Sequence, residues 1–229
     1  MINNKELNNY IENMKDEFLY WENILQKFEN ELSNIVDLKS KIDKELFNQV
    51  LTIFSEILNS FIKFSNNRDN WVKPFYTYQF TGMCVTVELK YEELKISFGF
   101  YENDFFLSTS LLNPKDLNKM SDSFWLNLLL LSNHGHLNIE RDSNIEVYNG
   151  INIEKRYPSK SQIFNLIKDF FFLDLTEGRL VDIANLKVSW PRNTNWSDLI
   201  LNGCYCFKLL YEINKEIMSK NSMKNEKGL

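Results

Sequence analysis

The sequence predicts an α+β fold, in which an N-terminal antiparallel helical hairpin packs on an antiparallel β-meander, followed by further helices and a small hairpin. Apolar residues recur at steps of three and four through the first 65 residues, a period typical of amphipathic helices. From residue 75 to 112 they alternate at every second position, which is typical of strands with one buried face. No internal repeat or long linker divides the 229 residues, so we expect one domain. Its parts are the helical hairpin over 5–65, the meander over 75–112, a mixed but mainly helical part over 114–219, and a frayed tail over 220–229.

The first helix is predicted from an unbroken heptad pattern that runs from Leu7 to Ile35 without Gly or Pro. Its nine apolar positions are Leu7, Ile11, Met14, Phe18, Trp21, Leu25, Phe28, Leu32 and Ile35. Trp21 and Phe28 are bulky for the seam of a two-stranded coiled coil, which prefers β-branched residues and Leu. The stripe is also widened by Tyr10, Leu19, Tyr20 and Ile24. We therefore expect this helix to pack against the core of its own chain, with the seam of a homodimer as the alternative.

A second helix is expected after a short connection. The run from Asp37 to Ser40 breaks the first pattern, and Ser40 with Asp43 offers a start that resembles a capping box. Apolar residues then recur at helical spacing, at Leu46, Val50, Ile53, Ile57, Phe61 and Phe64. The short connection favours an antiparallel pair of helices, and the polar run over 65–70 ends it.

The strands of the meander are predicted from the phase of their apolar residues. Tyr76, Tyr78 and Phe80 lie on even positions, whereas Met83, Val85, Val87 and Leu89 lie on odd ones. The change of phase predicts a bulge or turn at Thr81-Gly82. A third strand, with its apolar residues on even positions from Leu94 to Phe100, turns at Glu102-Asn103 into a fourth from Phe105 to Leu112.

The register between the second and third strands follows if their apolar residues share one face. The expected pairs are Leu89 with Ile96, Val87 with Phe98, and Val85 with Phe100, joined by a loop from Tyr91 to Leu94. This register places Lys95 opposite Lys90.

The second half of the chain carries less regular signals. Helix starts are predicted at Asn113-Pro114 and at Ser121-Asp122, the latter leading into the apolar run over 124–131. A small hairpin is predicted over 145–157 with its turn at Asn149-Gly150, and a helix over 160–175. The stretch from Trp190 to Trp196 is predicted to be a loop, and 197–219 the last helix.

Composition narrows the class of protein. A net charge of -5 and a pI near 5.2 argue against a dedicated nucleic-acid binder, because such domains present a basic face. The chain contains three Cys and no apolar run of ~18 residues, and its N-terminus lacks the layout of a signal peptide. We therefore expect a reduced, cytoplasmic protein that does not contact a membrane. A single Ala amid abundant Asn, Lys and Ile indicates the coding bias of an AT-rich genome, as in a low-GC bacterium or its phage.

Glu88 and Lys90 form the first of the candidate sites. Two residues apart on a strand, their side chains share a face, and the Glu88-Leu89-Lys90 triplet resembles one half of the PD-(D/E)xK motif of metal-dependent nucleases. In that reading the carboxylate holds a divalent ion and Lys90 supports the attacking water or the phosphate. The earlier acidic residue of the motif has its nearest counterpart in Asp69, which no Pro precedes. A solvated sheet face explains the triplet more simply, and we favour it.

A second candidate site combines His134 and His136 with Cys204 and Cys206, which are suitable ligands for zinc. The two Cys fall in the last predicted helix, where residues two apart project about 200° apart and cannot both reach one ion. We therefore favour buried, unliganded Cys over a zinc site or a catalytic Cys-His pair.

The remaining candidates are binding surfaces. Trp190, Arg192 and Trp196 would form a recognition patch for a protein, or a platform for a base, if they are exposed. If buried, the two Trp side chains close the end of the core against the last helix, which we favour. The basic cluster over 155–160 could bind a phosphate at the start of the following helix, although such a run is typical of a solvated edge.

Taken together, these patterns predict a non-catalytic protein that binds another protein and needs no cofactor. No phosphate-binding Gly loop, dinucleotide motif, nucleophile elbow or helical H-E-x-x-H sequence is present. The hypothesis is an inhibitor or immunity-type protein of a bacterial or phage defence or toxin system, comparable to anti-CRISPR proteins. The alternatives are a metal-dependent nuclease using Glu88, Lys90 and Asp69, and a homodimeric structural protein using the first helix.

Overall fold

A computed structural model of the 229-residue chain describes residues 2, 4–33, 43–65, 71, 75–79, 82–88, 94–101, 103–110, 120–141, 163–164 and 183–225. Its helices are α1 (Asn4–Asn13), α2 (Lys15–Ser33), α3 (Lys44–Phe64), α4 (Asp122–His134) and α6 (Trp196–Asn225). Its strands are β1 (Phe75–Gln79), β2 (Gly82–Glu88), β3 (Lys95–Tyr101), β4 (Asp104–Ser110), β5 (His136–Arg141) and β6 (Ile183–Pro191). The predicted α+β class, with N-terminal helices before an antiparallel sheet, is confirmed. No helix in these ranges combines the length and apolarity that a membrane span requires.

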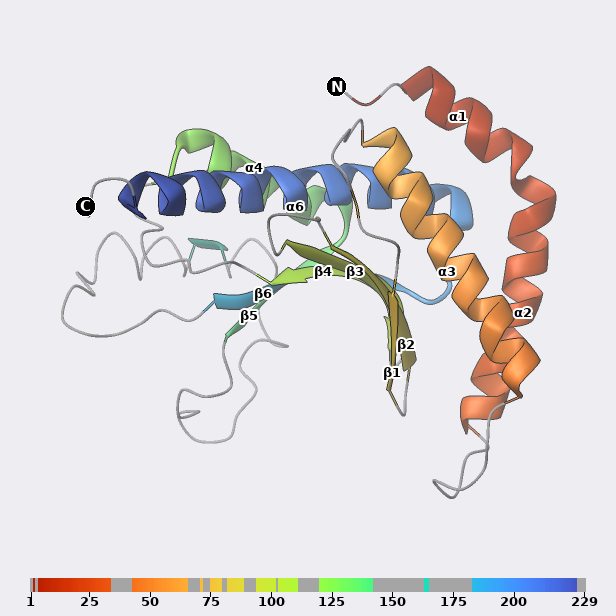
Figure 1. Cartoon of the computed structure of the whole chain (residues 1–229). Helices are drawn as coiled ribbons and strands as arrows, with labels where there is room; N and C mark the ends of the chain where they lie inside the picture. The colour runs from red at the N-terminus through yellow and green to blue at the C-terminus, as the bar shows by residue number, and fades with distance from the viewer. Residues whose placement is uncertain are drawn as a thin grey trace.

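The strands form one antiparallel sheet in the order β1-β2-β3-β4-β6-β5. Helices α3 and α6 cross the same face of this sheet (Figure 1). Helix α2 packs on α3 on the side away from the sheet, and α4 packs on α6 (Figure 1). The described part of the fold is therefore layered, and α2 lies in its outermost layer.

The core lies between the sheet and these helices. Four neighbouring strands contribute rows of buried side chains, because residues paired across antiparallel strands point to the same face. The first row is Phe98, Leu107, Val188 and Leu137, the second is Ile96, Thr109, Leu186 and Ile139, and the third is Phe100, Phe105 and Trp190. From α3, Phe54 and Phe61 place their rings edge-on against Phe98, with centroids 5.5 and 5.3 Å away.

The predicted pairing of the second and third strands is wrong by two residues. Val87 pairs with Ile96 and Val85 with Phe98, where the sequence predicted Phe98 and Phe100 as their respective partners. A shift of two keeps the same residues on the same face, so the alternation constrains the face but not the turn. In consequence Lys95 lies opposite Glu88 rather than opposite Lys90.

Two strands, β5 and β6, stand where the sequence predicted a mainly helical region. In β6 the apolar residues do alternate, at Leu186, Val188 and Trp190, but Pro191 directly afterwards favoured a loop. Pro191 instead ends the strand, where it pairs with Asp104. The predicted helix start at Asn113-Pro114 and the predicted hairpin turn at Asn149-Gly150 lie outside the described residues. So does the predicted helix over 160–175, apart from its residues 163–164.

The first helix is interrupted once, which the heptad pattern did not predict. At Met14 the backbone N–H lies 3.1 Å from the carbonyl oxygen of Tyr10 and 3.2 Å from that of Ile11, so it is shared between α-helical and 3₁₀ partners. The two axes, α1 and α2, meet at an angle there (Figure 1). The change of direction lets α1 reach α6, where Tyr205 donates a hydrogen bond to Asn4 (2.9 Å), while α2 follows α3.

The second helix and α4 both form, but only α4 begins as predicted. The sequence predicted a capping box starting at Ser40, which lies outside the described residues, whereas the helix begins at Lys44 with Asp43 as its cap. All six apolar residues of the α3 pattern are buried, and Asp43 caps the helix by accepting from the backbone N–H of Glu45 (2.8 Å). The side chain of Ser121 caps α4 by accepting from the N–H of Phe124 (3.3 Å). Local capping chemistry and apolar spacing therefore agree at both starts.

Helix α6 is held on the sheet by one buried polar contact and by one close approach. Asn214, fully buried, donates to Thr109 (3.1 Å), and Thr109 donates to the carbonyl of Lys95 (2.9 Å). Gly203 lies so close to α3 that an added Cβ would fall 2.3 Å from the ring of Phe61. Since Phe61 itself packs against Phe98, the ring has little room to move.

Replacing Gly203 should therefore destabilise the fold. We expect Gly203→Ala to lower the free energy of unfolding by about 1–3 kcal/mol through overpacking, in spite of the better helix propensity of Ala. Urea denaturation measures this difference. In a Phe61→Leu background the same substitution should cost less, because the smaller side chain leaves room. A stabilising Gly203→Ala in the wild-type background would contradict the close approach of α6 to α3.

Candidate protein-binding surface

The aromatic residues that the sequence singled out as a recognition patch, Trp190 and Trp196, are both buried. Trp190 donates its indole N–H to the carbonyl of His134 (2.6 Å). Trp196 packs against Phe18, Trp21 and Phe105, with ring centroids 5.3–6.2 Å apart. The buried alternative describes this arrangement, since the two Trp side chains fill the core beside the start of α6. The exposed recognition patch that they would have formed is not found.

Arg192, between the two Trp residues, joins the β6–α6 turn to α2. Its two terminal nitrogens contact the two carboxylate oxygens of Glu22 at 3.0 and 2.9 Å, and its Nε contacts Glu29. Its guanidinium also lies 5.4 Å from the centre of the Phe105 ring. Burial acts to lower the pKa of Arg192, but the hydrogen bonds to Glu22 and Glu29 raise its pKa overall, so Arg192 remains charged.

This clasp, formed by Arg192 with Glu22 and Glu29, is completed by Trp196, whose indole N–H also donates to Glu22 (3.1 Å). The side chain of Arg192 is only 16% exposed and that of Glu22 is 43% exposed, so the forked contact is shielded from water on the arginine side. Sequence reasoning noticed Arg192 between two aromatics but missed its partners, which lie 163 and 170 residues earlier. Only the acidic spacing of Glu22 and Glu29, two helical turns apart, could have hinted at a shared cation.

The His and Cys residues proposed as zinc ligands do not meet. His134 contacts Asn202 (3.1 Å) and stacks on Tyr205 at 4.8 Å, whereas Cys204 and Cys206 are buried within α6. His136 lies in β5. Burial raises the pKa of both thiols, which favours the protonated form, whereas zinc binds thiolate. Within the described ranges no three His, Cys, Asp or Glu side chains gather as metal ligands would.

Of the three residues proposed for a nuclease site, the structure describes only Glu88. Glu88 ends β2 and pairs with Lys95 of β3, so positions of opposite charge face each other across the strands. Asp69 and Lys90 lie outside the described residues, and so does the basic cluster over 155–160.

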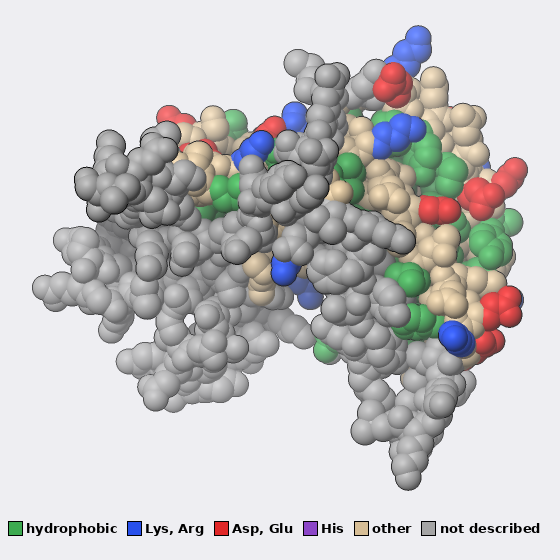
Figure 2. Space-filling model, in the orientation of Figure 1, with side chains coloured by type: hydrophobic (Ala, Val, Ile, Leu, Met, Phe, Trp, Pro, Cys, Tyr) green, Lys and Arg blue, Asp and Glu red, His purple; other side chains and the backbone are tan. Residues whose placement is uncertain are grey.

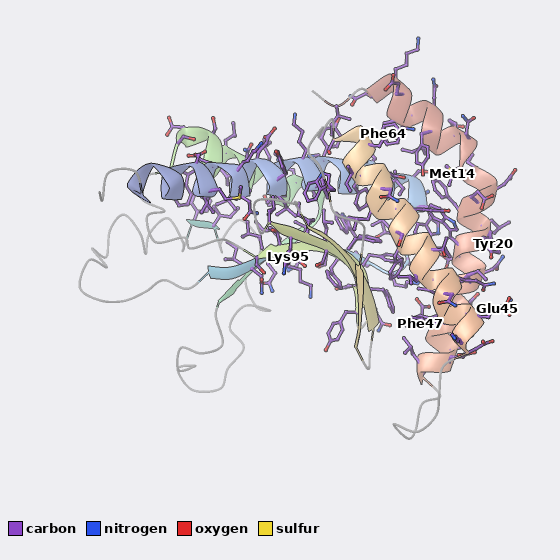
Figure 3. The ribbon with its side chains drawn as sticks, in the orientation of Figure 1. Met14, Tyr20, Glu45, Phe47, Phe64 and Lys95 are labelled. Carbon is purple, nitrogen blue, oxygen red and sulfur yellow. The ribbon has the colours of Figure 1, made fainter. Side chains whose placement is uncertain are left out.

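A different surface stands out on α2, where two neighbouring large side chains point away from the core. Leu19 is 67% exposed and Tyr20 47% exposed, although the residues directly before and after them, Phe18 and Trp21, are buried. Tyr20 projects outward from the outer layer of the molecule (Figure 3). The sequence had assigned Leu19 and Tyr20 to a widened core stripe. That part of the interpretation is wrong, because helical geometry turns them to the opposite side from Phe18 and Trp21.

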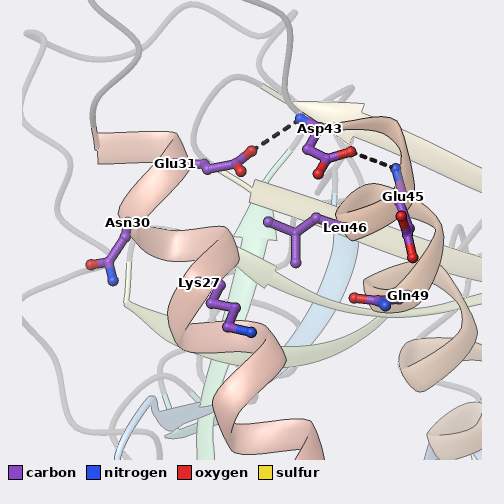
Figure 4. Close-up of a pocket in the computed structure, with 7 residues that line it drawn as sticks. All are labelled: Lys27, Asn30, Glu31, Asp43, Glu45, Leu46 and Gln49. Atoms are coloured by element: carbon purple, nitrogen blue, oxygen red, sulfur yellow. Dashed lines mark hydrogen bonds between the residues drawn. The ribbon is translucent and has the colours of Figure 1, made fainter.

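Two shallow hollows lie along α2, and the first of them begins at Tyr20. The first, of about 370 Å³, is lined by Tyr20, Asn23, Ile24, Gln26, Lys27 and Asn30. The second, of about 360 Å³, lies where the C-terminal part of α2 meets the start of α3 (Figure 4). It is lined by Lys27, Asn30, Glu31, Asp43, Glu45, Leu46 and Gln49. Because the hollows share Lys27 and Asn30, they form one continuous surface.

This surface, named here the α2 face, comprises Leu19, Tyr20 and the residues that line the two hollows. It combines an exposed apolar centre with a polar margin, which is the composition of a protein interface. Figure 2 shows hydrophobic and acidic side chains close together over this helical layer. Both hollows are shallow, and the second is lined by the acidic residues Glu31, Asp43 and Glu45.

The Arg192 clasp should contribute measurably to stability. Arg192→Lys keeps the charge but loses the forked contact with Glu22, so we expect the free energy of unfolding to fall by about 1–3 kcal/mol. Chemical denaturation tests this. Lys208→Gln, which removes the more exposed pair with Glu212 (3.6 Å), serves as the control and should cost under about 0.5 kcal/mol. Equal losses in the two variants would show that the clasp is not special.

Comparison with known proteins does not identify a family for this chain. No family model matches the sequence, and no curated protein and no solved structure is significantly similar to it.

Proposed function

We propose that this chain is a non-catalytic protein-binding protein that engages its partner through the α2 face. The exposure of Leu19 and Tyr20 carries this proposal. Burying one such side chain contributes about 1.5–3 kcal/mol, a gain that the isolated chain leaves unused at both positions. Adjacent, outward-pointing Leu and Tyr side chains on a helix are suitable anchors for a partner's pocket, and Tyr is enriched among residues that dominate binding.

The clasp supports the proposal because it fixes the helix that presents these anchors. Phe18 and Trp21 pack α2 on the core from behind, while Arg192 holds Glu22 and Glu29 from the side. A surface that is rigid before binding loses less conformational entropy when the complex forms. The α2 face is thus suited to a partner that docks on a preformed helix.

The proposed biological role is that of an inhibitor or immunity-type protein in a bacterial or phage defence or toxin system, as for anti-CRISPR proteins. Such a protein acts by occupying a surface of its partner and needs no active site of its own. The composition, with its single Ala and abundant Asn, Lys and Ile, supports a low-GC bacterial or phage setting.

The test is capture of a partner from a low-GC bacterial lysate by tagged wild-type protein and by a Leu19→Ser, Tyr20→Ser double variant. We expect a stoichiometric protein with the wild type and its loss with the double variant. Removing one anchor should cost about 2 kcal/mol of binding free energy. For the purified chain and its partner, this is a roughly 30-fold rise in Kd for each substitution. Isothermal titration calorimetry measures that change.

Leu126→Ser provides the matched control, since Leu126 is 55% exposed but lies on α4. It should retain the partner. All three substitutions are at exposed positions and should change the free energy of unfolding by no more than about 0.5 kcal/mol each. Retention of the partner by the double variant, or equal loss with Leu126→Ser, would overturn the role of the α2 face.

A further inference from the structure

We propose that the segment covering the α2 face is a basic amphipathic helix of the partner protein, with an apolar side directed at Leu19 and Tyr20 and Lys or Arg side chains along its flanks. This inference rests on the proposed function and adds the chemistry of the partner. It is argued from the charge around the exposed pair and from the length of the two hollows.

The acidic charge of the chain is concentrated on α1 and α2. Residues 4–33 carry a net charge of -4, against -5 for the whole chain. Their carboxylates are Glu6, Glu12, Asp16, Glu17, Glu22, Glu29 and Glu31, and their cations are Lys5, Lys15 and Lys27. Arg192 offsets only one charge at Glu22 and Glu29, and Lys15 offsets Glu12 at 2.5 Å. The remaining field around Leu19 and Tyr20 is negative, which attracts a basic partner.

Carboxylates lie at both ends of the α2 face. Beyond Tyr20, Glu17 of α2 and Glu56 of α3 lie near each other, and burial together with the charge of Glu17 raises the pKa of Glu56. At the other end, Glu31, Asp43 and Glu45 line the second hollow, with Lys27 between the two ends. Among the described residues, neither Glu17 nor Glu56 forms an ion pair with Lys or Arg. A cation from outside the chain would relieve the repulsion between them.

The length of this surface fits a helix. From Glu17 to Glu31 the α2 axis rises by about 20 Å, or roughly four helical turns. A partner helix of similar length can place basic residues near both acidic ends while its apolar side contacts Leu19 and Tyr20 between them. The hollow of about 370 Å³ on α2 and that of about 360 Å³ between α2 and the start of α3 give its side chains room.

The same charge argues against other occupants. Nucleic acid and anionic lipid surfaces are themselves negative and would be repelled. A second copy of this chain, docked through a two-fold axis, would bring two acidic faces together and pair like charges. A basic protein segment is the occupant that both the apolar centre and the acidic ends accept.

The test uses a labelled helical peptide of about 18 residues that carries Lys on one face and Leu on the other, with a Glu-for-Lys counterpart. Fluorescence anisotropy with the full chain should show binding of the Lys peptide that weakens as salt is raised, and no binding of the Glu peptide. Glu17→Gln with Glu56→Gln should weaken binding of the Lys peptide about tenfold, as should Leu19→Ser with Tyr20→Ser. The first pair should also raise Tm at neutral pH, because it removes a carboxylate that the fold keeps partly desolvated beside a like charge.

Asp122→Asn with Glu212→Gln is the control, since it removes the same number of charges from α4 and α6. Absence of binding by the Lys peptide, or equal weakening by this control, would overturn the inference. A partner captured through Leu19 and Tyr20 but retained by the Glu17→Gln, Glu56→Gln variant would also overturn it, while leaving the proposed function intact. A different result would contradict the proposed function, namely retention of the partner after Leu19 and Tyr20 are replaced.

Discussion

The structure depends on covering one face of an antiparallel sheet whose rows of buried side chains are unusually aromatic. Phe98 and Phe105 need large apolar partners, which α3 supplies through Phe54 and Phe61 and α6 through Trp196. Those two helices in turn have outer sides that must be covered, and α2 and α4 cover them. The buried contact between Asn214 and Thr109 fixes α6 over β4, because an unpaired amide in the core would be costly.

Much of this arrangement follows from local sequence patterns. The period of the apolar residues identified α3 and placed β1 to β4, and Ser121 marked the start of α4 correctly. The predicted start of α3 at Ser40 was too early, because Asp43 is the residue that caps the helix. The buried face of β3, with Ile96, Phe98 and Phe100, was predictable, whereas the pairing of β3 with β2 was not. A shift of two residues between β2 and β3 leaves every apolar side chain on the same side, so only the geometry of the turn decides between the two registers.

The features that were not predictable depend on residues far apart in sequence. The sequence favoured burial of Trp190 and Trp196, but what they pack against follows only from the pairing of β6 with β4 and from the contact of Trp196 with Trp21 of α2. The helix breaks at Met14 because α1 and α2 pack on different helices, and no residue near Met14 is a sequence signal for such a break. Leu19 and Tyr20 count as core residues in any apolar tally, and only the observed orientation of α2 shows that they face outward.

The two sides of α2 are under different constraints, which affects how this protein can evolve. The side of the helix that holds Phe18, Trp21 and Glu22 is tied to the core and to Arg192, whereas Leu19 and Tyr20 are 67% and 47% exposed. Substitutions on the outer side can therefore accumulate at little cost to folding. Selection is free to retune this side of α2 against a changing partner while the scaffold remains fixed, so sequence divergence between relatives should be greatest there.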